Sequence, residues 1–69
     1  MPTLKQRAYA YIRSAMSTGA LAAGDRLSPA ALAKEMGISH IPVREAISQL
    51  HSEGLAEQSP RRGAFVRQL

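Results

Sequence analysis

The chain has 69 residues, of which 45% are hydrophobic and 20% are charged, and none is cysteine. This length fits one compact domain and leaves little room for a deep substrate cavity. Without cysteine there is no disulfide framework, thiolate metal site or cysteine nucleophile, which fits the reducing cytoplasm. Nine Lys and Arg residues against five Asp and Glu give a net charge of +4, which favours an anionic partner such as nucleic acid or a membrane surface.

The first predicted element is an amphipathic helix over about residues 4–17. Thr3 and Gln6 have the spacing of a capping box, and Gly19 suits the left-handed turn that ends a helix. Apolar residues recur behind the box at helical spacing. We expect this stripe to face the core, and it consists of Leu4, Ala8, Tyr11, Ile12 and Ala15.

A membrane role for this segment is disfavoured. Charged residues interrupt it, unlike the apolar stretch of a secretory signal. No run in the chain approaches the roughly 18 apolar residues that span a bilayer. The polar side of the helix carries few charges and no tryptophan to anchor it at a lipid surface. We therefore expect no membrane partner.

A short extended segment and two short helices follow. Arg26-Leu27-Ser28, after the turn at Gly24-Asp25, is a candidate edge strand. Ser28 caps and Pro29 opens a helix over about 29–36, which ends at Gly37. Ser39 is a candidate cap for a helix over about 40–52, which tolerates Pro42 in its first turn and ends at Gly54. The buried stripe of this last helix is Val43, Ala46, Ile47 and Leu50.

The two helices are separated by only Gly37-Ile38-Ser39, the spacing of a helix-turn-helix. So short a turn favours a steep crossing, which small and apolar residues would fill. The alternative is an ordinary helical hairpin in a small bundle. The residues expected between the two helices are Leu32, Met36, Ile38, Val43 and Ala46, with Ala33 where the backbones approach.

The outer face of the helix over 40–52 is the candidate DNA-reading surface. It carries short polar groups and one apolar residue rather than the usual rows of Lys and Glu, which suits close approach to a groove. Arg44 can bind a guanine bidentately or a phosphate, and serine hydroxyls can bind base edges or phosphates. The alternative role for Arg44 is a surface ion pair with a nearby glutamate. The remaining residues on or beside this face are His40, Ile41, Glu45, Ser48, Gln49 and Ser52.

The C-terminal segment reads as a β-hairpin over about 55–68, with strands at 55–59 and 64–67 around Pro60-Arg61-Arg62-Gly63. Arg61 and Arg62 at its tip can contact phosphates or enter the minor groove. The alternative is that they only keep an exposed turn hydrated.

No catalytic or metal-binding constellation is apparent. His40 and His51 lie on one helix but about 16 Å apart, too far to share a metal ion. There is no Ser/His/acid set, phosphate loop or carboxylate pair. We expect neither an enzyme nor a cofactor, and the glutamates read as surface charges.

Several of these segments together resemble the N-terminal domain of GntR-family transcriptional regulators. The resemblance covers about residues 9–66, and the two segments Pro42-Val43-Arg44-Glu45-Ala46 and Arg62-Gly63-Ala64-Phe65-Val66 look most like the FadR-type branch. Further matching segments are Gly24-Asp25-Arg26-Leu27-Ser28, Leu32-Ala33, Met36-Gly37-Ile38-Ser39 and Glu53-Gly54-Leu55.

The resemblance implies a mainly α winged helix-turn-helix, a three-helix core plus wing, that binds double-stranded operator DNA as a homodimer. In the family the recognition helix enters the major groove and the wing tip reaches the minor groove. Carried over by position, Ser39, His40 and Ile41 open the reading helix, Arg44 contacts DNA, and Arg62 with Gly63 takes the wing-tip place.

This chain departs from the family pattern at two places. His40 and Ile41 stand where arginine and threonine are usual, and Pro29-Ala30-Ala31 stands where Glu-Arg-Glu is frequent. These departures remove up to two cationic contacts while leaving the fold intact. They also leave open a second function, a winged helix that serves as a protein-interaction module.

FadR-type regulators continue beyond the wing into a helical effector domain that supplies much of the dimer. We expect this chain to be the DNA-reading head of such a cytoplasmic regulator, a repressor, with a stand-alone DNA-binding unit as the alternative.

Overall fold

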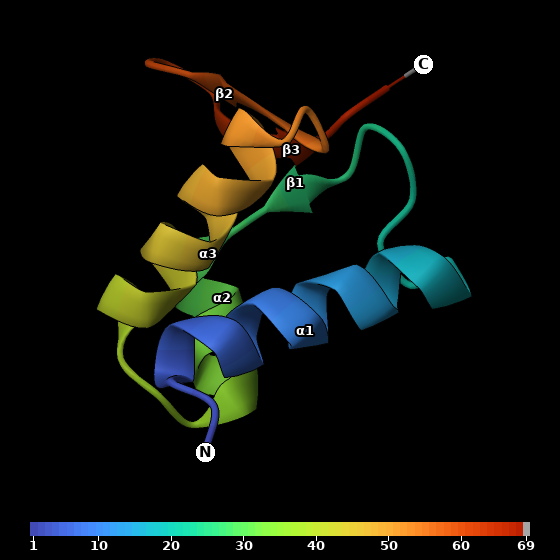
Figure 1. Ribbon diagram of the computed structural model, residues 1–69. Coiled ribbons are helices and arrows are strands. Elements are labelled where there is room, and N and C mark those ends of the chain that lie inside the picture. The colour runs from blue at the N-terminus through green and yellow to red at the C-terminus, as the bar shows by residue number, and fades with distance from the viewer. Residues whose placement is uncertain (69) are drawn as a thin grey trace.

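The computed structural model describes residues 1–68 and shows three helices and a small sheet (Figure 1). The chain order is helix, strand, two helices and two strands. The helices are α1 (Leu4–Thr18), α2 (Pro29–Met36) and α3 (His40–Ser52), and the strands are β1 (Arg26–Leu27), β2 (Ala56–Ser59) and β3 (Gly63–Val66). The expected three-helix core with a wing is therefore confirmed.

Local capping chemistry sets the helix ends. Thr3 Oγ1 accepts a hydrogen bond from the Gln6 backbone N–H at 3.1 Å, and Gln6 Oε1 accepts one from the Thr3 N–H at 2.8 Å, so the capping box is confirmed. Gly37 ends α2 in the left-handed conformation with φ of 70°, which a side chain would disfavour. Ser39 occupies the N-cap position of α3, but its side chain makes no capping hydrogen bond, in contrast to the expectation.

The buried face of α1 differs from the predicted stripe. Ala8 and Ile12 are buried as expected, but Leu4 and Tyr11 are 45% and 40% exposed. Tyr9 packs against the core instead. The reason is that α1 lies across two helices: the Tyr9 hydroxyl reaches Glu53 after α3, while the Tyr11 hydroxyl reaches Glu35 on α2. A tyrosine can lie on the buried or on the exposed face of a helix, because its ring is apolar and its hydroxyl can form a hydrogen bond at the edge. Helical spacing alone therefore cannot decide which tyrosine faces the core.

The core forms where α1, α2 and α3 meet the inner face of the sheet. The predicted α3 stripe is fully confirmed, because all four residues are at most 2% exposed. Leu32 and Ala33 of α2 are buried beside it, and Met36 and Ile38 pack at its margin, as expected for a helix-turn-helix crossing. The buried residues of α3 are Pro42, Val43, Ala46, Ile47 and Leu50.

The sheet is antiparallel in the order β1-β3-β2, so the predicted edge strand is confirmed at Arg26–Leu27, while Ser28 caps α2 instead. Leu27 pairs with Ala64 across β1 and β3, and both are buried against the helices. β2 pairs with β3 from Ala56↔Val66 to Ser59↔Gly63. β2 ends at Ser59 as predicted but begins one residue later, and β3 is shifted one residue toward the turn, because Gly63 joins the ladder.

Candidate nucleic-acid interface

The side of α3 opposite its buried residues is open to solvent. Ile41 is 68% exposed, although it is a large hydrophobic residue. Around it the other predicted contact residues of α3 are also exposed, which is the placement that the sequence pattern predicted. They are Ser39, His40, Arg44 and Ser48.

Arg44 is not tied to the protein. Among residues 1–68, the arginine side chains that donate hydrogen bonds are those of Arg13 and Arg67, and the acceptors are the Tyr9 hydroxyl and the Gly54 carbonyl. The alternative of a surface ion pair for Arg44 therefore has no partner within the described part of the chain. Its guanidinium retains its donors for an external acceptor.

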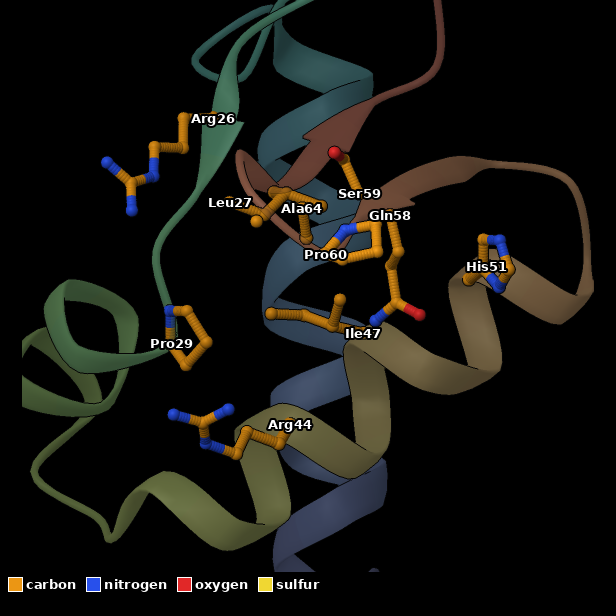
Figure 2. Close-up of a pocket in the computed structure, with 11 residues that line it drawn as sticks. Arg26, Leu27, Pro29, Arg44, Ile47, His51, Gln58, Ser59, Pro60 and Ala64 are labelled. Atoms are coloured by element: carbon orange, nitrogen blue, oxygen red, sulfur yellow. The ribbon is translucent and has the colours of Figure 1, made fainter.

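An open groove of about 640 Å³ separates α3 from the sheet. Figure 2 shows Arg44 reaching from α3 toward Pro29 and Arg26 projecting from β1, with both guanidinium groups on one side of the view. Ile47 and Pro60 contribute apolar surface to the lining of the groove. No carboxylate lines this groove, so an anion that enters meets two fixed positive charges and no repulsion.

The sequence pattern missed Arg26 as a candidate contact. Its guanidinium lies beside the wing, with Nε and Nη2 both 3.8 Å from where a Cβ of Gly63 would stand. The pairing of Arg26 with Phe65 brings it there. A pairing between strands so distant in the chain leaves no local signal in the sequence. The only local indication that Arg26 faces outward is its place directly before the buried Leu27.

A second, shallower groove lies on the neighbouring side of α3, between α3 and the first turn of α1. It is lined by Lys5 of α1 and by residues that include Glu45, Ser48 and Gln49. Ser48 therefore faces a mixed-charge surface, while Arg44 faces a purely basic one. Lys5 is the second basic residue that the sequence pattern did not single out.

The hairpin tip carries the remaining predicted contacts. Arg61, Arg62 and Gly63 are all exposed. The Arg62 backbone N–H donates to Ser59 Oγ at 3.4 Å, and Gly63 has a φ of 86°, a left-handed conformation that favours glycine. The tip therefore presents two adjacent arginines on a tight turn. In Figure 1 the tip and the outer side of α3 project toward the same side of the molecule.

A polar cluster anchors the end of α3 to α1. The Tyr9 hydroxyl donates to Glu53 Oε1 at 2.5 Å, Arg13 donates to the Tyr9 oxygen at 3.0 Å, and Gln49 donates to Glu53 Oε2 at 3.3 Å. The hydrogen bond from Tyr9, together with Gln49 and the charge of Arg13, lowers the pKa of Glu53. Glu53 is an exposed surface charge, as predicted, and its carboxylate also links α1 to α3.

Two other kinds of functional feature are absent from the part of the chain that the structure describes. Residues 1–68 contain no group of three or more His, Asp or Glu side chains placed to hold a metal ion. Within the same residues, no helix has the length and apolar character needed to cross a membrane.

Comparison with known proteins agrees with this geometry. An uncharacterised helix-turn-helix transcriptional regulator of Streptomyces ambofaciens is 41% identical over 64 residues, which are 93% of this chain and 27% of that protein. Among the curated relatives, the chain spans between 25% and 34% of their length.

Solved structures are similar over nearly the whole chain. A GntR-family transcriptional regulator from Pseudomonas syringae is 32% identical with a TM-score of 0.83, covering 100% of this chain and 30% of that one. The DNA-binding domain of AraR, in complex with operator ORX1, is 25% identical with a TM-score of 0.84, covering 96% of this chain and 81% of that one. The model of the gntR family of bacterial regulatory proteins matches residues 4–66. The chain therefore belongs to the gntR family of bacterial regulatory proteins.

Proposed function

We propose that this chain is the sequence-reading head of a transcriptional regulator and binds double-stranded operator DNA. The observation that carries the proposal is the pair of Arg44 and Arg26 on a groove without carboxylates, between an exposed helix face and an exposed hairpin tip. The B-DNA major groove is about 12 Å wide and admits an α-helix. With α3 in the major groove of DNA, the neighbouring phosphodiester strand would run along the protein's basic groove, between α3 and the sheet, toward the hairpin.

Each proposed contact has a distinct chemistry. Arg44 has a planar fork of donors that matches O6 and N7 of guanine. Ser39 and His40 stand at the start of α3, where unpaired backbone N–H groups favour a phosphate. Ser48 offers a hydroxyl to a base edge or to a phosphate one turn beyond Arg44.

The hairpin tip serves a different surface of the duplex. Arg61 and Arg62 provide two positive charges for the minor groove or its phosphates. Gly63 has no side chain, so the backbone of the tip can approach these phosphates closely. Arg26 on β1 adds a third positive charge beside the tip, next to Gly63. Such contacts fix register and orientation, and they carry little sequence information.

Finer assignments extend this proposal. The segments Pro42–Ala46 and Arg62–Val66 support a place in the FadR-type branch of the family. In a longer regulator of this kind, two such heads would dimerise through an effector domain and occupy two half-sites. We propose repression in the bacterial cytoplasm as its role and no enzymatic activity for this chain.

A protein-interaction module is the second candidate, because His40 and Ala30 stand at positions where the family pattern has arginine, which removes up to two cationic contacts. A fluorescence titration against a labelled duplex separates the two functions. We expect binding at low salt that weakens steeply as the salt concentration rises, because phosphate contacts release counterions. Selection from a random duplex library should then return a guanine-containing motif. No binding to any duplex at tens of micromolar protein would favour the protein-interaction module.

A further inference from the structure

Ile41 is an exception on the surface of this protein. At 68% exposed, it is the most exposed large hydrophobic side chain in the described residues apart from the N-terminal Met1. It does not belong to the core or to the hydrophobic residues at the core margin. Its β-branched side chain has few rotamers, so little freedom is lost when it meets a partner. The fold therefore holds a stiff apolar group in water, ready for a contact outside the protein.

The surroundings of Ile41 limit the size of that partner. The exposed residues next to it on α3 are His40, Arg44 and Glu45, all polar or charged. A helix or strand of another protein needs a broader apolar patch than one isoleucine provides. A single methyl group surrounded by hydrogen-bonding atoms matches this small apolar spot better.

Such a methyl group lies where α3 is proposed to bind. Among the base edges in the major groove, the C5-methyl of thymine is the apolar group, and apolar side chains contact it. Arg44 follows Ile41 by three residues, so the two lie on one helix face about 4.5 Å apart along the axis. Base pairs are stacked about 3.4 Å apart. The two side chains therefore reach the same or neighbouring base pairs.

We propose that Ile41 reads the C5-methyl of a thymine that lies within about one base pair of the guanine bound by Arg44. This inference rests on the proposed DNA-binding function. It assigns a specificity role to one of the positions at which the chain departs from its family pattern. The same methyl on 5-methylcytosine presents the same chemistry, and the experiment separates the two sources.

A uracil scan of the selected duplex tests the contact. Each thymine is replaced singly by deoxyuridine, which removes only the methyl group, and the Kd of the full chain is measured at fixed salt. We expect one thymine per half-site, next to the essential guanine, at which the replacement weakens binding about fourfold, the equivalent of one buried methyl group. Replacement of thymines elsewhere in the same duplex is the internal control.

Two variants attribute the effect to Ile41. Ile41→Ala should bind the thymine and uracil duplexes equally, because the side chain no longer reaches the methyl. Ile41→Val retains both branches at Cβ and should retain most of the discrimination. Because the position is exposed, neither variant should change the thermal unfolding midpoint by more than about 4 °C.

A second pair of duplexes identifies the source of the methyl group. At the sensitive position, 5-methylcytosine·G is compared with unmodified C·G. Tighter binding of the methylated duplex in both comparisons, thymine against uracil and 5-methylcytosine against cytosine, would confirm that the methyl group is read. If the T·A duplex binds tightest of all, thymine is the natural source of the methyl group. If the 5-methylcytosine duplex binds tightest, the assignment to thymine is overturned.

Two results distinguish failure of this inference from failure of the proposed function. Selective binding that no uracil replacement weakens, or a uracil effect that persists unchanged in Ile41→Ala, overturns methyl reading by Ile41 and leaves DNA binding intact. Absence of any selective duplex overturns both.

Discussion

The two parts of the molecule proposed to meet DNA, α3 and the β2–β3 hairpin, are supported in different ways. α3 has five buried residues along one side and a hydrogen-bonded anchor at its end. The hairpin tip, residues 60–63, is entirely exposed, and the only buried residues of the two strands are Ala56, Ala64 and Val66. The helix is thus fixed by packing, whereas the tip is fixed by a four-pair strand ladder and a turn.

This difference matches two kinds of recognition. Base readout requires donors and methyl contacts at set positions, so it belongs on an element that cannot shift without disturbing the core. Phosphate contacts tolerate small displacements, because charge acts over several ångströms, with a screening length of about 8 Å at physiological salt. We therefore expect substitutions in α3 to change sequence preference and substitutions at the tip to change affinity for all sequences alike.

The largest expected effect comes from removing the packing behind α3. Leu50→Ala truncates a side chain with 0% exposure in the core and should lower the free energy of unfolding by about 2–5 kcal/mol. Chemical denaturation monitored by circular dichroism measures it. Ser48→Ala, on the exposed side of the same helix, is the control and should stay within about 0.5 kcal/mol of the parent. Equal effects of the two substitutions would contradict the assigned faces of α3.

Substitution of Arg44 should have the next largest effect. Arg44→Ala is expected to cost about 1–3 kcal/mol of binding free energy on the selected duplex and to reduce discrimination at one base pair. Lys34→Ala removes an equal charge from an exposed site on α2 and should leave the base preference unchanged. A titration series over single-base variants of the duplex makes the comparison. An unchanged preference in Arg44→Ala would remove this residue from the reading face.

The tip should respond in the opposite manner. Replacing both Arg61 and Arg62 by alanine is expected to weaken binding to selected and scrambled duplexes by the same factor. The slope of log K against log salt should become shallower by about 0.9 for each lost phosphate contact. If the double variant changes sequence preference instead, the hairpin takes part in base readout and the contrast with α3 is wrong.

The smallest effect concerns the anchor of α3. The hydrogen bond from Tyr9 lowers the pKa of Glu53 in the folded state, so the ionised carboxylate stabilises the fold. This contribution is complete above the ordinary pKa near 4.5 and is lost as the pH falls through the lower folded value. Tyr9→Phe should therefore unfold at a lower temperature than the parent near pH 7 and converge toward it in acid. A constant difference from pH 7 to pH 3 would show that the hydroxyl acts independently of the carboxylate charge.

The sequence predicted the helices well because their signals are local. The capping box at Thr3, the Ser28-Pro29 start and the glycine at Gly37 each act within one turn, and the bounds of α2 and α3 agree with the prediction. The orientation of α1 was predicted only in part, because Tyr9 and Tyr11 both have an apolar ring and a polar end. Which of the two faces the core depends on the positions of Glu53 and Glu35, far along the chain.

The candidate site shows the same division between local and distant signals. The exposed face of α3 follows from helical spacing, and the exposure of the hairpin tip follows from the turn residues between Pro60 and Gly63. The basic groove does not, because Arg26 enters it through a pairing between β1 and β3, and Lys5 approaches α3 only when α1 packs across it. The sequence thus indicates the reading helix, while the flanking charges require the tertiary structure.

The central proposal is that the outer face of α3 enters the DNA. Amide chemical-shift changes, measured as the selected duplex is added, report which residues the DNA contacts. We expect the largest changes from His40 to Ser48 and a second group at Arg61–Gly63, with small changes around Tyr11 on the outer side of α1. Changes concentrated on α1, with α3 unaffected, would contradict the proposal.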